Sequence, residues 1–356
     1  MNAKLAAAGS PWQFPTDRER PAARDGLPVW TESFVALDEG EVYGAYILKH
    51  QEFFVRGRSV EVGDLQLPVS LGHVDDKYSN VSVALLFDAL RRTPRLYGLG
   101  FGSEQSEFAK LLTAARWQHL TVPFFFDVKS PDAFARNIRL PPDKGAMQTA
   151  LRVLGQLRLA KAAFRLRRLR RLGRSKSSRQ SLAAPYEVRE APRFDGSVDR
   201  LFEAHVKSYA LIGDRRAGAL NCLYPEDQPE YIRLVVTKDR EIVGWSVVLD
   251  TRMHDHKYFG DLRVGSLADC LAAPGEAPTV VAAADEFLSR RGVDIVVSNQ
   301  LHPAWCGALQ AAGYEEGPSN FFLYFSDGLA KELGEGAAWD REAHINRGDG
   351  EGPDNL

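Results

Sequence analysis

The apolar residues in the second half of the chain alternate between strand spacing and helix spacing, and they predict a series of nine elements. Residues 278–292 carry one helical apolar stripe that begins after a proline and ends at a glycine, as helices commonly do. Residues 231–249 contain two apolar runs joined at Lys238-Asp239-Arg240, which predicts a hairpin. The predicted elements are strand 186–192, helix 197–213 with Ser197 as N-cap, the two hairpin strands, strand 257–265, helix 278–292, strand 293–299, helix 302–313 and strand 319–326.

The same pattern occurs twice in the chain. One constant shift without gaps aligns the apolar positions of residues 63–126 with those of residues 260–323. This alignment places the tripeptide Gly63-Asp64-Leu65 on Gly260-Asp261-Leu262, and upstream residues 41–48 lie over residues 241–248. Two helices, three strands and a tripeptide are unlike a chance match when all of them align at one constant shift. The sequence therefore predicts an internal duplication of one α/β unit.

Composition and length are those of a globular protein with two domains. The chain has 356 residues, of which 44% are hydrophobic and 26% charged. No apolar run reaches the roughly 18 residues of a membrane span, and the first residues lack the pattern of a signal peptide. Cys222, Cys270 and Cys306 fit neither a disulfide framework nor a zinc site. We expect a cytoplasmic protein without a bound metal.

The order of elements resembles that of the GNAT family of acyl-CoA N-acyltransferases. The sequences that carry the resemblance are DREIVG in the hairpin and VDIVVSN followed by ALQAAGY near the end. It covers residues 186–326 and, as a first copy, residues 29–128. Two such units are similar to the tandem GNAT arrangement, which is also seen in FemX-like transferases, and GDLQLPVS and VSNQLHPAW look like members linked to bacterial exopolysaccharide clusters. The resemblance implies an α/β fold with mixed sheets, in which two GNAT-like domains in tandem form an internal pseudo-dimer.

The resemblance and the composition together predict five segments. The first copy has only residues 29–40 ahead of its hairpin, which is too short for a first strand and helix, so we expect it to be truncated. The segments are a disordered N-terminal segment (1–27), a truncated GNAT-like domain (28–140), a basic helical linker (141–184), a complete GNAT-like domain (185–328) and a disordered acidic tail (329–356).

The chain departs from the family at the place where the CoA pyrophosphate should bind. GNAT proteins normally carry Q/R-x-x-G-x-G/A there, and backbone N–H groups at a helix start hold the phosphates. Neither copy has this motif. The first copy has Asp75 and Asp76, which would repel a pyrophosphate, whereas the second has one acid, Glu276, and a flexible Gly275. Charge and completeness both favour the second copy as the catalytic one.

Asp261 and His302 are the candidate catalytic residues. Acylation of an amine needs a base, and the resemblance places Asp261 beside the thioester; the alternative is that Asp261 orders a turn. His302 follows a strand end, where side chains face the cleft of open α/β sheets, but it could instead cap its own helix. Cys306 shares a helix face with His302, so a Cys–His nucleophile competes with a simple buried thiol. The family's tyrosine acid has no counterpart, because Leu309 and Leu112 occupy its positions.

The expected cofactor is acetyl-CoA or another acyl-CoA, used as co-substrate. Asn299 could hold its pantetheine arm or cap a helix. His254 and His256 bracket Asp255 in a turn, a pattern more typical of a solvated loop than of a metal site. The residues expected to contact the cofactor are Leu262, Val264, Gly275, Thr279 and Asn299.

Residues 151–180 form a basic segment with 11 Lys and Arg residues and no acid. Three interpretations stay open: a helix on an anionic membrane surface, a site for RNA or an anionic glycan, and a solvated linker helix. Aromatic residues that could stack on bases are not interleaved with the charges, which makes nucleic acid an unlikely partner.

These observations lead to one functional prediction with two alternatives. We expect a cytoplasmic acyl-CoA-dependent N-acyltransferase, which the basic segment would allow to bind peripherally at the inner face of the membrane. Its acceptor would be an amine on a small metabolite, amino sugar or glycan precursor, bound in the groove between the copies. The alternatives are a FemX-like aminoacyl or peptidyl transferase that depends on charged tRNA, and a non-catalytic binding protein on a decayed GNAT fold.

Overall fold

The structure, a computed structural model, describes residues 1–10, 12–15, 26–102, 106–140, 144–162, 185–334, 339 and 342–350. The chain forms two compact units of mixed α/β structure. Unit 1 comprises Met1–Val122, Val206–Tyr224 and Ser319–Leu356, and unit 2 comprises Pro123–His205 and Pro225–Pro318. The predicted domain limits, 28–140 and 185–328, are therefore wrong, because segments from each half of the chain belong to both units.

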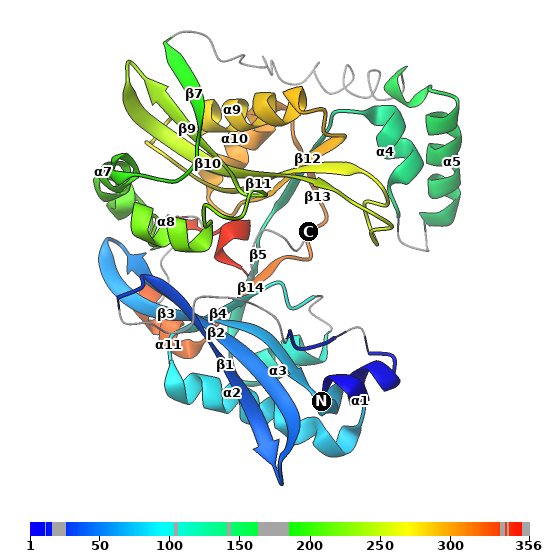
Figure 1. The fold of residues 1–356 in the computed structure, drawn as a ribbon, viewed down its shortest axis with the longest axis vertical. Helices are drawn as coiled ribbons and strands as arrows, with labels where there is room; N and C mark the ends of the chain where they lie inside the picture. The colour runs from blue at the N-terminus through cyan, green and yellow to red at the C-terminus, as the bar shows by residue number, and fades with distance from the viewer. Residues whose placement is uncertain are drawn as a thin grey trace. The chain divides into compact units, whose positions relative to one another are not determined.

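Unit 1 contains a mixed sheet in the order β15-β8-β2-β3-β4-β14-β5, with β1 paired to β2 (Figure 1). Its elements are α1 (Asn2–Ala7), β1 (Val29–Asp38), β2 (Glu41–Val55), β3 (Arg58–Ser70), η1 (Leu71–His73), η2 (Asp76–Tyr78), α2 (Ser79–Arg92), β4 (Leu96–Leu99), α3 (Glu107–Ala114), β5 (Gln118–Thr121), η4 (Val206–Ser208), β8 (Leu211–Gly213), α8 (Ala217–Leu223), β14 (Phe322–Phe325), α11 (Asp327–Leu333), β15 (Ala343–His344) and η6 (Arg347–Asp349).

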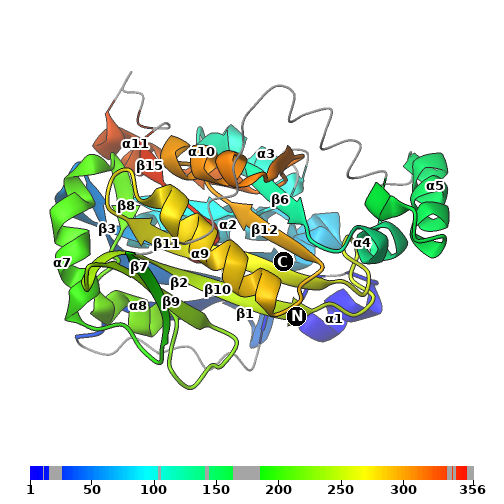
Figure 2. The same ribbon diagram turned by 90° about the horizontal axis from the view of Figure 1, so that it is seen from above.

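Unit 2 contains a second mixed sheet in the order β13-β6-β12-β11-β10-β9-β7. Helix α9 lies across one face of β10 and β11 (Figure 2). The elements of unit 2 are β6 (Phe124–Val128), α4 (Pro131–Asn137), α5 (Gly145–Gln156), β7 (Tyr186–Ala191), α7 (Gly196–His205), β9 (Ile232–Lys238), β10 (Glu241–Arg252), β11 (Arg263–Ala272), α9 (Ala277–Arg290), β12 (Ile295–Asn299), α10 (Pro303–Ala312) and β13 (Glu315–Gly317).

The two units share a central motif, which confirms the predicted duplication and fold class. In unit 1, β2 and β3 are antiparallel, α2 follows, and β4 returns parallel to β3. In unit 2, β10 and β11 are antiparallel, α9 follows, and β12 returns parallel to β11. The apolar stripe of α9 packs into one core cluster with β11, β12 and α10, because its buried residues recur at helical spacing. An equivalent cluster in unit 1 joins α2 and α3 to β2, β3 and β4.

The last strand of each repeat belongs to the sheet of the other unit. β6 follows β5 in the chain but pairs with β12 on one edge and β13 on the other, both in unit 2. β14 follows β13 but pairs with β4 and β5 in unit 1. In Figure 1 the orange β14 accordingly accompanies the cyan β4 and β5. This reciprocal exchange satisfies both backbone edges of each exchanged strand, and it explains why the predicted domain limits were wrong.

The two Gly-Asp-Leu tripeptides are not equivalent in the structure. Gly63 and Asp64 lie inside β3, where they pair with Leu96 and Tyr97 of β4. Gly260 and Asp261 lie in a turn before β11, and Gly260 has a φ of +57°. A Cβ atom at Gly260 would approach the Asn137 carbonyl oxygen to 2.3 Å, so the turn requires glycine.

The residue that corresponds to Gly63 is Gly265. Gly265 pairs with Val296 of β12, one position after the first parallel pair Val264–Ile295, and Gly63 pairs with Leu96 of β4 in the parallel pairing of unit 1. A Cβ atom at either glycine would contact buried side chains at 2.8–3.2 Å, so both glycines let the core pack against the sheet. Asp64 consequently corresponds to Ser266 rather than to Asp261.

Several predicted elements differ from the structure. The helix predicted over 197–213 ends at His205, and its last residues form β8, which pairs with β2 and β15. The strand predicted over 257–265 begins only at Arg263, because a bridge between His256 and Gly260 closes a turn before it. The predicted hairpin is confirmed: Asp239 and Arg240 have positive φ angles, which suit the turn between two twisted strands.

Both predicted disordered ends contain ordered structure. Within 1–27, α1 buries Leu5 completely against Val69 and Leu71. Within 329–356, β15 pairs with β8, and Ala343, Asn346 and Asp349 are fully buried. The acidic and glycine-rich composition of the tail suggested disorder, but unit 1 buries its apolar side chains together with His344, Asn346 and Asp349.

The C-terminal segment 342–350 is fixed in unit 1 by charged hydrogen bonds and by an apolar cluster. Arg215 and Asp349 form an ion pair of 2.6 Å, and neither side chain is exposed. Lys49 donates hydrogen bonds of 2.8 Å to the carbonyl oxygens of Asp349 and Gly350, and it lies 3.2 Å from Asp64. The Tyr97 hydroxyl donates to the Asp349 carbonyl at 2.6 Å, and burial holds the pKa of Tyr97 well above its ordinary value.

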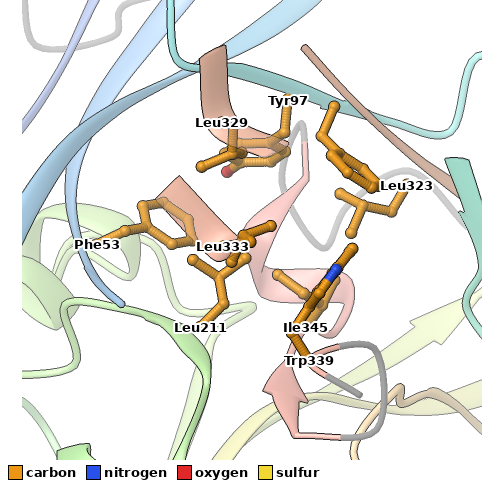
Figure 3. Close-up of a pocket in the computed structure, with 9 residues that line it drawn as sticks. Phe53, Tyr97, Leu211, Leu323, Leu329, Leu333, Trp339 and Ile345 are labelled. Atoms are coloured by element: carbon orange, nitrogen blue, oxygen red, sulfur yellow. The ribbon is translucent and has the colours of Figure 1, made fainter. Parts of the chain in front are cut away.

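Figure 3 shows the apolar cluster around this segment. The side chains point toward one another and enclose a pocket too narrow to admit a water molecule. They come from strands β2, β4, β8 and β14, from α11 and from the C-terminal segment. The lining residues are Phe53, Tyr97, Leu211, Leu323, Phe325, Leu329, Leu333, Trp339 and Ile345.

We expect Asp349→Asn to destabilise the protein by about 3–5 kcal/mol, because it leaves the buried Arg215 guanidinium without its counter-charge. Urea denaturation followed by circular dichroism measures the loss. Asp327→Asn is the matched control, since Asp327 pairs with Lys331 on the surface of α11 and should leave stability close to that of the wild type. Equal stabilities of the two variants would contradict the structural role of the tail.

Candidate functional site

A cleft of about 470 Å³ opens in unit 1 where strands β3 and β4 separate. The two strands pair in parallel only at Gly63–Leu96 and Asp64–Tyr97. Beyond that point the cleft is lined by the end of β3, the loop after it, the residues after β4 and the start of α3. Open α/β sheets bind ligands in such crevices at the carboxyl ends of parallel strands.

The end of β3 carries a bulge, beyond which it stays paired with β2 but no longer with β4. The register between β2 and β3 shifts between Ala45 and Ile47, opposite Leu67 and Pro68. Leu67 has a φ of +46°, a left-handed conformation that is uncommon for a residue with a branched side chain, and Pro68 cannot donate to the sheet. The bulge therefore turns Leu67, Pro68 and Val69 toward the cleft, which all three line.

The loop after β3 brings the ionisable groups to the cleft. His73 ends η1, whose start is capped by Ser70, and its Nδ1 lies 3.9 Å from Glu107 Oε2. Only 18% of the His73 side chain is exposed, against 81% of Glu107. Glu107 begins α3, where Ser106 accepts a hydrogen bond from the Ala109 N–H. The cleft thus contains an imidazole beside a carboxylate.

Of the two acids in this loop, Asp75 has a hydrogen-bonding partner, and Asp76 follows it in the sequence. Asp75 caps η2 by accepting from the Lys77 N–H, and its carboxylate lies 2.9 Å from the Lys77 ammonium. The side-chain hydrogen bond to Lys77 lowers the pKa of Asp75, so the carboxylate stays ionised. The net charge of Asp75, Asp76 and Lys77 remains negative near the start of α2.

The corresponding place in unit 2 is filled by side chains. The Gln300 side chain, 1% exposed, follows β12, and its amide nitrogen lies 3.5 Å from Cys270 Sγ in β11 and 3.2 Å from Ser298 Oγ. Cys306 donates to the Gln300 carbonyl oxygen at 3.2 Å. These contacts join the ends of β11 and β12, where the sequence analysis expected the cofactor, whereas the cleft described above lies in unit 1.

The structure separates the two predicted catalytic residues. Asp261 precedes β11 and accepts a hydrogen bond of 2.9 Å from the Asp255 N–H, so it orders a turn. His302 follows β12 and caps α10 by accepting from the Ala304 N–H at 3.2 Å. Because β11 and β12 are parallel, these residues lie at opposite ends of the strand pair, at least about 13 Å apart along it. They therefore cannot act together on one substrate.

The predicted cofactor-binding residues are also divided between the two ends of that strand pair. Leu262 and Val264 lie at the amino end and are completely buried. Gly275 and Thr279 lie at the carboxyl end, where Gly275 has a φ of +88° and Thr279 donates a 2.8 Å hydrogen bond to Glu276. Asn299, 2% exposed, lies at the same end and donates to the Pro123 carbonyl oxygen at 3.4 Å.

Other predictions concern the basic segment and the membrane. Residues 163–180 of the basic segment lie outside the described residues, and α5 covers only its start. Where the chain is described, no helix has both the length and the hydrophobicity that crossing a membrane requires. The described residues also contain no cluster of His, Cys, Asp and Glu that could hold a metal ion.

Comparison with solved structures finds proteins of similar fold. One is Saccharomyces cerevisiae N-myristoyltransferase with bound myristoyl-CoA (11% identity, TM-score 0.48, 81% of this chain and 67% of that chain). Others are a GCN5-related N-acetyltransferase from Anabaena variabilis ATCC 29413 (10%, 0.47, 82% and 61%) and a tandem GNAT protein from the clavulanic acid biosynthesis pathway (11%, 0.46, 91% and 87%). This chain spans less than two thirds of the length of the Anabaena protein. No family model and no curated protein matches the chain.

Two of these three names are those of GNAT proteins, the family that the sequence resembles, and one of the two is a tandem GNAT protein. Identities near one tenth say nothing of the substrate or of which residues act. The cleft residues His73 and Glu107 were not predicted. Pro68 inside an apolar strand was the available signal, because proline within a strand pattern indicates a bulge or an edge.

The Cys306 thiol should be unreactive. Burial, with a smaller contribution from Glu316, raises the pKa of Cys306 to about 11, so its thiolate fraction at pH 8 is on the order of 10⁻³. We expect iodoacetamide to label it hundreds of times more slowly than an unfolded control in guanidinium chloride, with the rate rising as pH approaches 11. Mass spectrometry measures the labelling, and rapid labelling at pH 8 would instead support the Cys–His nucleophile.

Proposed function

We propose that this chain is an acyl-CoA-dependent N-acyltransferase that binds its acyl donor in the cleft of unit 1. The acceptor is the amine of a small metabolite, amino sugar or glycan precursor. The separation of β3 and β4 beside a bulge carries the proposal, because it opens a cleft at the carboxyl end of two parallel strands. Among the described residues that line this cleft there is no lysine or arginine, which disfavours a tRNA-borne donor.

The reaction needs a proton acceptor close to the donor. As the amine nitrogen attacks the thioester carbon, a C–N bond forms, the C–S bond breaks, and one proton must leave the nitrogen. His73 supplies the imidazole that takes this proton and returns it to the departing thiolate. The carboxylate of Glu107 lies 3.9 Å from this imidazole.

Val74→Trp tests the location of the donor. Val74 lines the cleft and is 36% exposed, so a tryptophan there should fill the cleft without disturbing the core. We expect isothermal titration calorimetry to show at least tenfold weaker binding of octanoyl-CoA. Val188→Trp, on β7 of unit 2 and 37% exposed, is the matched control and should bind as the wild type does. Unchanged binding by Val74→Trp would place the donor elsewhere.

His73→Gln tests the proton acceptor. Loss of a general base commonly slows a reaction by about 10²–10⁴-fold, so we expect turnover to fall in that range while the donor Kd stays within about threefold. Release of free CoA thiol from octanoyl-CoA, in the presence of amino sugars and small amines, gives the rate. His254→Gln, an exposed substitution in unit 2, is the control. A His73→Gln enzyme with wild-type turnover would remove His73 from the mechanism.

A further inference from the structure

The side chains that line the cleft determine which part of an acyl thioester the cleft can bind. Leu67, Pro68 and Val69 form one side of the cleft, Val74 adjoins them, and Phe101 and Phe108 form the other side. Six apolar side chains from three separate segments thus converge on one space. Burial of a hydrocarbon chain among such side chains is favourable by about 0.8 kcal/mol for each methylene.

The charges around the cleft disfavour the phosphates of the donor. Of the described residues that line the cleft, only His73 and Glu107 are ionisable, and none is a lysine or an arginine. The neighbouring elements carry acids and lysines in equal number: Lys4 on α1, Asp75 before η2, Asp76 and Lys77 within it, and Glu107 and Lys110 on α3. A diphosphate bound inside would lack the lysine and arginine side chains that commonly pair with phosphates.

The N-terminal segment completes the apolar wall. Leu5 of α1 is fully buried against Val69 and Leu71, so it anchors the residues that follow it to the end of β3. Ala8, Gly9 and Ser10 then line the cleft, together with Trp12, whose indole is 53% exposed. Trp12 thus adds an exposed apolar surface to the mouth of the cleft.

We propose that the cleft binds the acyl chain of the donor and selects medium-length aliphatic chains over acetyl. This inference rests on the proposed function, since it assumes that an acyl thioester enters the cleft. The chain lies between Val69 and Phe108, Trp12 covers part of it, and the phosphates of CoA stay in solvent. The cleft volume of about 470 Å³ is within the range of small-molecule pockets, about 300–1,000 Å³.

A series of thioesters tests the inference on the full chain by isothermal titration calorimetry. For acetyl-, butyryl-, hexanoyl- and octanoyl-CoA we expect Kd to fall about fourfold for each added methylene, and on the order of 100-fold from butyryl to octanoyl. Octanoyl-pantetheine, which lacks the nucleotide and its phosphates, should bind within about tenfold of octanoyl-CoA. Similar Kd values for acetyl-CoA and octanoyl-CoA would overturn the inference and leave the proposed function standing.

Trp12→Ala shows whether the N-terminal wall contributes. We expect it to weaken octanoyl-CoA binding about tenfold and to leave acetyl-CoA binding within twofold. Tyr258→Ala, an aromatic residue of unit 2 that is 44% exposed, is the matched control and should change neither value. A Trp12→Ala protein that keeps the full chain-length dependence would overturn the role of this wall. Failure of every thioester to bind the wild type would overturn the proposed function and this inference together.

Discussion

The exchange of the last strands is the constraint on which the rest of the structure depends. β6 and β14 each lie between two strands of a sheet and so have backbone partners on both edges. Without β14, the sheet of unit 1 would end at β4, and β5 would have no strand to pair with. Because an unpaired interior edge exposes a row of N–H and C=O groups, neither sheet is complete until the other half of the chain supplies its strand.

The polar interior of unit 1 is organised around the same connection. The C-terminal segment follows β14 and α11, and it returns to β8 through β15. There Asp349 forms an ion pair with Arg215, and its backbone carbonyl oxygen accepts hydrogen bonds from Lys49 and Tyr97. Buried charges are tolerated where each has a partner, and here the partners come from three widely separated stretches of sequence. Apolar side chains around Trp339 cover this network from one side.

The local sequence pattern was sufficient to predict the elements whose formation depends on residues close to one another in the sequence. The hairpin at Asp239 and Arg240, helix α9 and the repeated order of strands and helices all follow from periodicity and turn residues. The predicted alignment of the first copy on the second was wrong by a few residues in β3 and β11. It relied on the repeated tripeptide, whereas the strand pairing, which only the structure shows, gives a different register. The strand exchange and the ordered tail depend on contacts between distant residues, which apolar spacing does not encode.

The candidate site likewise depends partly on local sequence and partly on contacts between distant residues. Charge along the loop at Asp75 and Asp76 led the sequence analysis to the second copy, but the cleft depends on how far two strands separate and on what fills the gap. In unit 2 the Gln300 side chain occupies that gap, while in unit 1 the bulge at Leu67 and Pro68 keeps it open. Neither effect follows from residue type alone. Only Pro68, a proline within a strand pattern, indicated from the sequence that the pairing of β3 is interrupted at this point.

The place of β14 also determines when unit 1 can finish folding during synthesis. β4 is among the first strands to be made, yet its partner β14 and the segment around Asp349 are among the last. Translation adds about 5–20 residues per second, so β4 waits on the order of tens of seconds for its neighbour. During that interval the nascent chain carries an open sheet edge at β4, so unit 1 can complete its sheet only after β14 has been made.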